Sequence, residues 1–201
     1  FHATIGYGKT VLMSQYARLP GRLCAWYHLD SLDNEASTIL SYFVLSLERA
    51  LDGFGFDAGA VSREKLAPAQ FLRELLVDTA EYMKKIPEQR LVIVLDDFQA
   101  VTDEGVLTVM EKILEYLPAK VRMFIGTKGQ LPGFVDRRVL EGEAAVMTAQ
   151  QLAFTEEEAK KLSQTMGVLE GEEETMSVIW KYTEGWPAGI MFIYLYLRQN
   201  R

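Results

Sequence analysis

A run of five apolar residues that ends in two carboxylates constrains the fold more than any other feature of this chain. Residues 91–95 read Leu-Val-Ile-Val-Leu, and Asp96 and Asp97 follow directly. A strand that is apolar at every position must be buried on both faces, as in parallel sheets covered by helices on each side. The run therefore predicts a central strand of an α/β fold, with an acidic pair at its carboxyl end.

The rest of the chain alternates short apolar runs with amphipathic stretches, which is typical of α/β proteins. Further strands are expected at residues 23–27 and 121–126. Residues 52–67 contain three glycines and predict a surface loop. Helices are expected at residues 9–19, 35–51, 68–85, 103–117, 155–164, 172–183 and 187–198.

Two domains are predicted, with a boundary near Gln150. Residues 1–150 would form an α/β P-loop NTPase core with a parallel sheet flanked by helices, and residues 151–201 a small helical domain. Thr155 followed by Glu158 is a capping-box pattern that marks the first helix of the second domain. Only Phe1 and His2 precede the expected phosphate loop, which begins at Ala3, so the first strand of the core is expected to be truncated.

The composition favours a cytoplasmic protein without a membrane span. The net charge is −7, and the lysines and arginines form no dense basic cluster, so DNA contact is expected only through a region outside this segment. The single cysteine, Cys24, has no partner for an intramolecular disulfide. Cys24 and Trp26 are interpreted as core residues, and His2 and His28 as structural.

The strongest chemical motif is the glycine loop at the start of the chain. Gly6-Tyr7-Gly8-Lys9-Thr10 leads straight into a helical pattern, as in loops whose backbone N–H groups surround a phosphate chain. Lys9 would neutralise the phosphates, and Thr10 would bind magnesium. Val11, the next residue, is also predicted to contact the nucleotide. Ala3 stands where the full pattern has glycine; the alternative is a glycine turn that only begins a helix.

The acidic pair supplies the second half of a phosphate site. A buried strand that ends in acid is how P-loop proteins hold a carboxylate beside magnesium. Asp96 is the predicted metal ligand, and Asp97 is the candidate for orienting or deprotonating the attacking water. The alternative is two carboxylates that lie at the surface at a strand end. ATP or ADP with Mg²⁺ are the expected cofactors.

Several segments together resemble one family over essentially the whole chain. They are Gly6-Tyr7-Gly8-Lys9-Thr10, Trp26-Tyr27-His28-Leu29-Asp30 with Asp33-Asn34, Leu95-Asp96-Asp97-Phe98, Leu152-Ala153-Phe154-Thr155 with Glu158-Ala159, and Thr183-Glu184-Gly185-Trp186-Pro187-Ala188-Gly189. This set resembles the STAND signalling ATPases, and within them the maltose-regulon activator type of large ATP-binding LuxR-family regulators. The last segment is the most specific, since P-loop proteins have no general need for it.

The resemblance implies a nucleotide-controlled switch of a transcription regulator, with weak ATPase activity and nucleotide-dependent self-association of the full-length protein. It also implies that Pro187 packs near the adenine. Members of the family usually carry Ser-Arg where this chain has Thr127-Lys128. Lys128 keeps the charge of a phosphate-contacting residue without the bidentate geometry of arginine. Two alternatives are a regulatory nucleotide-binding module without hydrolysis and a small-molecule phosphotransferase.

Overall fold

The computed structural model describes residues 1–56, 68–169 and 171–200. The chain divides into two compact units. The first contains Phe1 and residues 10–145, and the second contains residues 2–9 and 146–201. The segment that carries the glycine loop therefore belongs to the same unit as the C-terminal helices, and the two units are described separately below.

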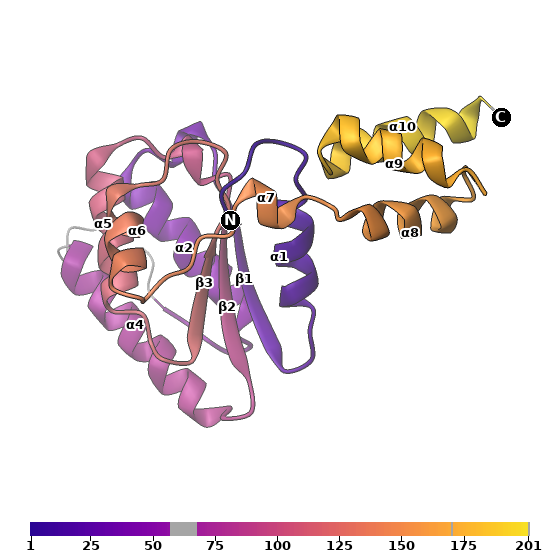
Figure 1. Ribbon diagram of the computed structural model, residues 1–201. Coiled ribbons are helices and arrows are strands. Elements are labelled where there is room, and N and C mark those ends of the chain that lie inside the picture. Colours follow the sequence, from indigo (N-terminus) through magenta and orange to yellow (C-terminus); the bar gives the residue numbers. More distant parts are fainter. Residues whose placement is uncertain (57–67, 170, 201) are drawn as a thin grey trace. The chain divides into compact units, whose positions relative to one another are not determined.

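The first unit is built on a three-stranded parallel sheet. Its strands are β1 (Arg22–His28), β2 (Arg90–Asp96) and β3 (Val121–Ile125), in the order β1-β2-β3 (Figure 1). The register pairs His28 of β1 with Asp96 of β2, so both residues stand at the carboxyl edge of the sheet. As expected for a sheet buried on both faces, every residue of β2 after Arg90 is buried.

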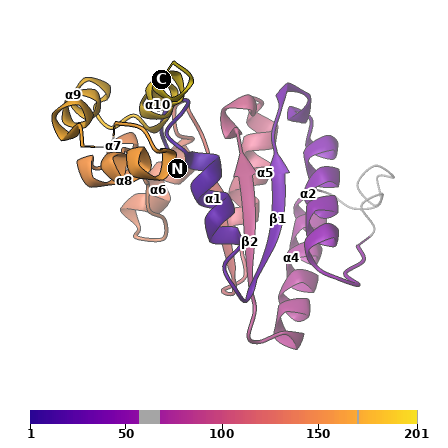
Figure 2. The same cartoon turned by 90° about the vertical axis from the view of Figure 1, so that its right-hand side faces the viewer.

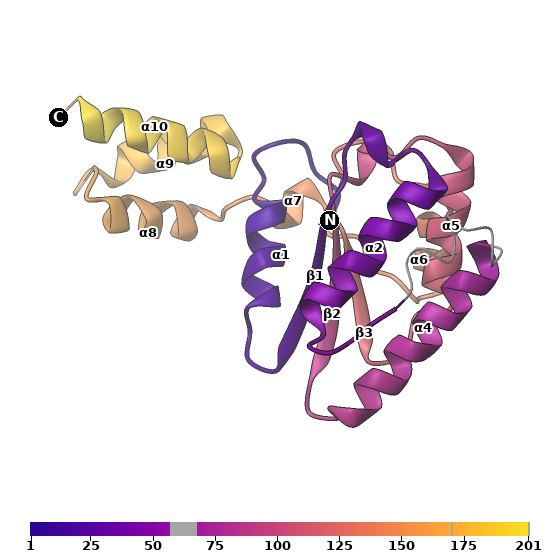
Figure 3. The ribbon, with the colours of Figure 1, turned by 180° about the vertical axis from the view of Figure 1, so that it is seen from behind.

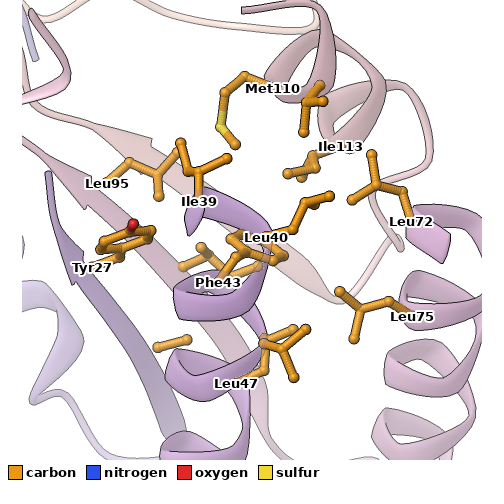
Figure 4. Packing of buried hydrophobic residues seen from close by; sticks show 14 of the residues in the cluster. Tyr27, Ile39, Leu40, Phe43, Leu47, Leu72, Leu75, Leu95, Met110 and Ile113 are labelled. Atoms are coloured by element: carbon orange, nitrogen blue, oxygen red, sulfur yellow. The ribbon is translucent and has the colours of Figure 1, made fainter. Parts of the chain in front are cut away.

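Helices cover both faces of this sheet, as Figure 2 shows for α1 (Lys9–Ala17) on one side and α2 (Ala36–Ala50) and α4 (Pro68–Lys85) on the other. Alternate residues of β2 face opposite ways. Ile93 belongs to the large cluster under α2, α4 and α5 (Glu104–Glu115), part of which Figure 4 shows. Val92 and Val94 pack with Met13 of α1.

Short elements complete the first unit. The 3-10 helices η1 (Ser31–Asp33) and η2 (Phe98–Ala100) follow β1 and β2, and α6 (Gly133–Leu140) follows β3. Phe1 also pairs with the end of β3, because its amino group donates to Ile125 O at 2.8 Å and Thr127 N–H donates to Phe1 O at 2.9 Å.

The second unit contains α7 (Ala149–Leu152), α8 (Glu156–Met166), α9 (Glu173–Thr183) and α10 (Pro187–Gln199) (Figure 3). Helices α8, α9 and α10 share a small apolar core. Its buried members are Ala159, Val168, Leu169, Met176, Ile190 and Tyr194. The predicted capping box is present, since the Thr155 side chain accepts from Glu158 N–H and the Glu158 carboxylate accepts from Thr155 N–H.

The α/β class with a parallel sheet flanked by helices is confirmed, while the domain scheme with its boundary near Gln150 stays a prediction. Helices α6 and α7 have no counterpart in the sequence expectations, and α1 ends at Ala17 instead of continuing to residue 19. The expected loop at residues 52–67 lies outside the described residues from 57 onward. Across the described ranges, no helix has the length and hydropathy needed to cross a bilayer.

Candidate functional site

Thr10 and Asp96 meet at the carboxyl edge of the sheet in the first unit. The Thr10 hydroxyl donates to Asp96 Oδ2 at 2.7 Å, and the Asp97 N–H donates to Asp96 Oδ1 at 3.0 Å. Asp96 is only 3% exposed. Both of its oxygens are therefore paired, as a buried carboxylate requires. The geometry joins the last residue of β2 to the first turn of α1, although the two are far apart in the sequence.

These two side chains are suitable ligands for a magnesium ion. Magnesium prefers oxygen ligands and is usually held by one or two protein side chains together with water and substrate phosphates. The hydrogen bond uses the proton of the Thr10 hydroxyl and leaves its lone pairs available to a cation. No cluster of three or more His, Cys, Asp or Glu side chains suited to a metal occurs among the described residues. A cation held by Thr10 and Asp96 would take its other ligands from water or phosphate oxygens, as magnesium usually does.

Asp97 follows in a conformation that is uncommon for a residue other than glycine. Its φ is 56° and its ψ 40°, in the left-handed region that Asp and Asn tolerate better than most residues. Its Oδ1 accepts from Gln99 Nε2 at 2.7 Å, and the Gln99 side-chain oxygen accepts from Lys128 N–H at 3.0 Å. The side chain remains 40% exposed. Asp97 is thus held through Oδ1 while its side chain stays partly exposed to solvent.

His28, which the sequence alone predicts to be structural, is a neighbour of Asp97. The His28 Nε2 atom lies 3.6 Å from Asp97 Oδ2, and the imidazole is 62% exposed. The contact becomes an ion pair when His28 is protonated. The signal that could have found it is the parallel register, because His28 ends β1 opposite Asp96 and strand ends of a parallel sheet meet at one edge.

The turn that follows His28 is fixed by a buried pair. The Tyr27 hydroxyl donates to the Asp33 carboxylate, which also accepts from Asp30 N–H at 2.8 Å. Burial, followed by the hydrogen bond to Asp33, raises the pKa of Tyr27 far above its ordinary value. Asn34 Oδ1 accepts from Thr102 N–H at 2.7 Å and ties this turn to the segment after η2. These residues of the resembling segments therefore have a structural role at the edge of the sheet.

The glycine loop is held within the second unit. The Lys9 ammonium donates to Ala3 O at 2.7 Å and to Thr4 O at 3.1 Å. Gly6 has a φ of +86°, which favours glycine. Its carbonyl accepts from Ala188 N–H at 3.0 Å, and the Trp186 Nε1 donates to Ile5 O at 3.1 Å. The loop conformation thus depends both on its own lysine and on the first turn of α10.

The structure divides the predicted site residues between two groups. Thr10, Asp96, Asp97 and Lys128 belong to the first unit, where each takes part in the hydrogen bonds described above, Lys128 through its backbone. The second unit contains Gly6, Tyr7, Gly8, Lys9 and Pro187. Val11 is 60% exposed on α1. The chain joins the groups directly, because Lys9 and Thr10 are consecutive residues of α1.

Taken together, the structure defines a parallel α/β unit with a paired hydroxyl and carboxylate at its sheet edge, and a glycine loop that opens helix α1. No protein-family model matches the chain. The chain is 28% identical over 198 residues to the HTH-type transcriptional regulator MalT of Serratia proteamaculans (strain 568). The similarity covers 97% of this chain and 21% of that protein. The chain therefore spans about a fifth of the length of this curated relative.

Proposed function

We propose that this chain is the ATP-binding, slowly hydrolysing switch of a cytoplasmic LuxR-family transcription regulator. The hydrogen bond between the Thr10 hydroxyl and Asp96 Oδ2 carries the proposal. In P-loop proteins the hydroxyl that follows the loop lysine and the carboxylate that ends a central strand share one magnesium ion. A glycine turn that only begins a helix has no need for this pairing. The similarity to MalT supports the regulatory part of the proposal.

In the proposed reaction each residue has a separate task. Lys9 contacts the phosphates, Thr10 and Asp96 hold the cation, and Asp97 orients or deprotonates the attacking water. The magnesium ion, when bound, neutralises charge on the phosphate oxygens. Asp97 is suited to its task because its carboxylate is fixed by Gln99 and yet partly open to water. Self-association and DNA contact would involve the longer protein.

Calorimetric titration with ATP, in the presence of Mg²⁺ and then of excess EDTA, tests this function. We expect saturable binding of one nucleotide per chain that weakens when the cation is removed. Radiolabelled ATP in a single-turnover experiment then separates a switch that hydrolyses from a module that only binds. Absence of ATP and ADP binding by the folded chain would contradict the proposal.

The metal role of Asp96 gives a prediction for Asp96→Asn. Asparagine can offer its oxygen to the Asp97 N–H, and its amide can donate to the Thr10 hydroxyl, so the fold should be retained. The variant loses the negative charge that attracts the cation. We expect the stimulation of ATP binding by Mg²⁺ to fall about tenfold, corresponding to about 1.4 kcal/mol. Calorimetry at several Mg²⁺ concentrations measures this. An unchanged Mg²⁺ dependence would remove Asp96 from the metal site.

Pro187 is proposed to pack against the adenine. It occupies the first position of α10, where its fixed φ suits a helix start. Alanine is also accepted there, so Pro187→Ala should keep the helix. We expect ADP affinity to fall about tenfold from the loss of apolar contact, while binding of inorganic tripolyphosphate stays at the parent level. In a nucleotide-bound structure, a distance above about 6 Å between Pro187 and the base would exclude the contact.

A further inference from the structure

Helix α10 contacts the glycine loop in the second unit through Trp186, the residue that precedes its first turn. The indole Nε1 donates to Ile5 O at 3.1 Å. Two residues further on, Ala188 N–H donates to Gly6 O at 3.0 Å. The carbonyls of Ile5 and Gly6 thus accept hydrogen bonds from residues 186–188, although these two segments lie near opposite ends of the sequence.

The indole ring also occupies space that two glycines leave open. A Cβ atom on Gly6 would lie 2.6 Å from Trp186 Nε1 and 2.7 Å from Ala188 Cβ. A Cβ on Gly189 would lie 2.5 Å from Trp186 Cε3. All three distances are far below ordinary contacts of a Cβ atom. The ring therefore lies between the loop and the first turn of α10. It fits there because Gly6 and Gly189 have no side chain.

We infer that Trp186 is a positioning residue that sets the conformation in which the glycine loop receives phosphate; this inference rests on the proposed function. Loop N–H groups can point toward one anion only if the backbone has a fixed conformation. Gly6, with its positive φ, is one of two adaptable glycines of that backbone, the other being Gly8. Trp186 and Ala188 hold the carbonyls of the two peptides that flank the Cα atom of Gly6. Loss of the indole donor should therefore weaken phosphate binding without removing any residue that touches phosphate.

Trp180 provides a matched control. Its Nε1 also donates to a backbone carbonyl, that of Phe154, at 2.8 Å, and it lies in the same unit. Trp180→Phe and Trp186→Phe therefore make the same chemical change, and each removes one indole hydrogen bond. Only the second variant alters a bond to the loop. A general loss of stability in the helices would affect both variants, whereas a positioning role affects Trp186→Phe alone.

The experiment measures the affinity of the whole chain for Mg²⁺-tripolyphosphate, a probe without base or ribose. We expect Trp186→Phe to bind about fivefold more weakly than the parent, equivalent to about 1 kcal/mol for one hydrogen bond. Trp180→Phe should bind like the parent. Gly6→Ala, which forces the ring away and strains a positive φ, should lose more than Trp186→Phe. Thermal unfolding of each variant reports on stability separately.

The outcomes are distinguishable. Equal affinities of the parent, Trp186→Phe and Trp180→Phe overturn the positioning role and leave the proposed function standing. A parent that binds neither Mg²⁺-tripolyphosphate nor Mg²⁺-ATP overturns the proposed function and this inference with it. If Trp186→Phe does not fold, the double variant Trp26→Phe/Trp180→Phe provides the test. Trp186 is the only tryptophan left in that variant, so its fluorescence reports on Trp186 alone. Its fluorescence should change on addition of Mg²⁺-tripolyphosphate, and constant emission would overturn the role.

Discussion

Lys9→Ala is expected to lower ATP affinity about 100-fold, which is the loss of roughly 2–3 kcal/mol typical of hydrogen bonds to a charged group. The Lys9 ammonium donates to the neutral carbonyls of Ala3 and Thr4, at 2.7 and 3.1 Å. Phosphate oxygens are stronger acceptors because they are ionised. The lysine can therefore exchange its loop carbonyls for phosphate oxygens when a nucleotide binds. Calorimetry with Mg²⁺-ATP measures the change.

Lys120→Ala is the control for this prediction. Lys120 also donates to a backbone carbonyl, that of Pro87, at 3.1 Å, and the variant changes the net charge by the same amount. It precedes β3, at the end of the strand opposite the candidate site. We expect parent-like ATP affinity. Equal losses in the two variants would point to net charge as the cause, and no loss in a folded Lys9→Ala variant would contradict the phosphate-loop assignment.

The sequence predicts best those elements whose residues are compatible with only one local structure. The run of residues 91–95 can be satisfied only by burial on both faces, and β2 is buried throughout after Arg90. The helix expected at residues 68–85 has these bounds in the structure, where it ends before Ile86 and Pro87. The Thr155 capping box also follows from local chemistry, because its two hydrogen bonds lie within one turn.

The features that the sequence does not predict depend on pairing between distant segments. His28 carries no local sign of function, and its contact with Asp97 arises from the register of β1 against β2. The turn that follows β2 positions the Gln99 side chain so that it bonds both to Asp97 and to the Lys128 backbone. Trp186 is explained by the family resemblance only as part of a motif. Its hydrogen bond to Ile5 joins residues near opposite ends of the sequence, and a local sequence pattern cannot predict such a contact.

Short helices show a further limit of sequence patterns. Helix α6 (Gly133–Leu140) has no buried residue and is only eight residues long, too short for a clear helical periodicity in the sequence. Its Phe134 packs against the large apolar cluster and contacts the Phe98 ring, and its Arg137 forms an ion pair with Glu111 at 2.6 Å. Helix α7 (Ala149–Leu152) is a single turn and too short for any periodicity. Both elements depend on tertiary context, as their absence from the sequence expectations indicates.

Asp97→Asn is expected to reduce ATP hydrolysis at least about 100-fold while ATP affinity stays close to the parent value, since a positioned base contributes roughly 10²–10⁴ to a rate. The choice of asparagine follows from the backbone. Asp97 has a φ of 56°, which asparagine tolerates and alanine does not, so Asp97→Ala would add backbone strain to the loss of the carboxylate. The amide oxygen of the introduced asparagine can still accept from Gln99 Nε2, and the bond that fixes the side chain can be kept.

The measurement is a single-turnover rate with enzyme in excess over radiolabelled ATP, together with a calorimetric affinity for each protein. Asp103→Asn is the matched control. It removes the same charge, and asparagine caps a helix as well as aspartate, so the hydrogen bond from Val106 N–H should persist. We expect this control to hydrolyse ATP at the parent rate.

Parent-like turnover by Asp97→Asn would remove Asp97 from the reaction. The His28 imidazole would then be the next candidate for the base, because it lies 3.6 Å from Asp97. Parent protein that binds ATP but shows no turnover would instead identify the chain as a regulatory module that only binds nucleotide.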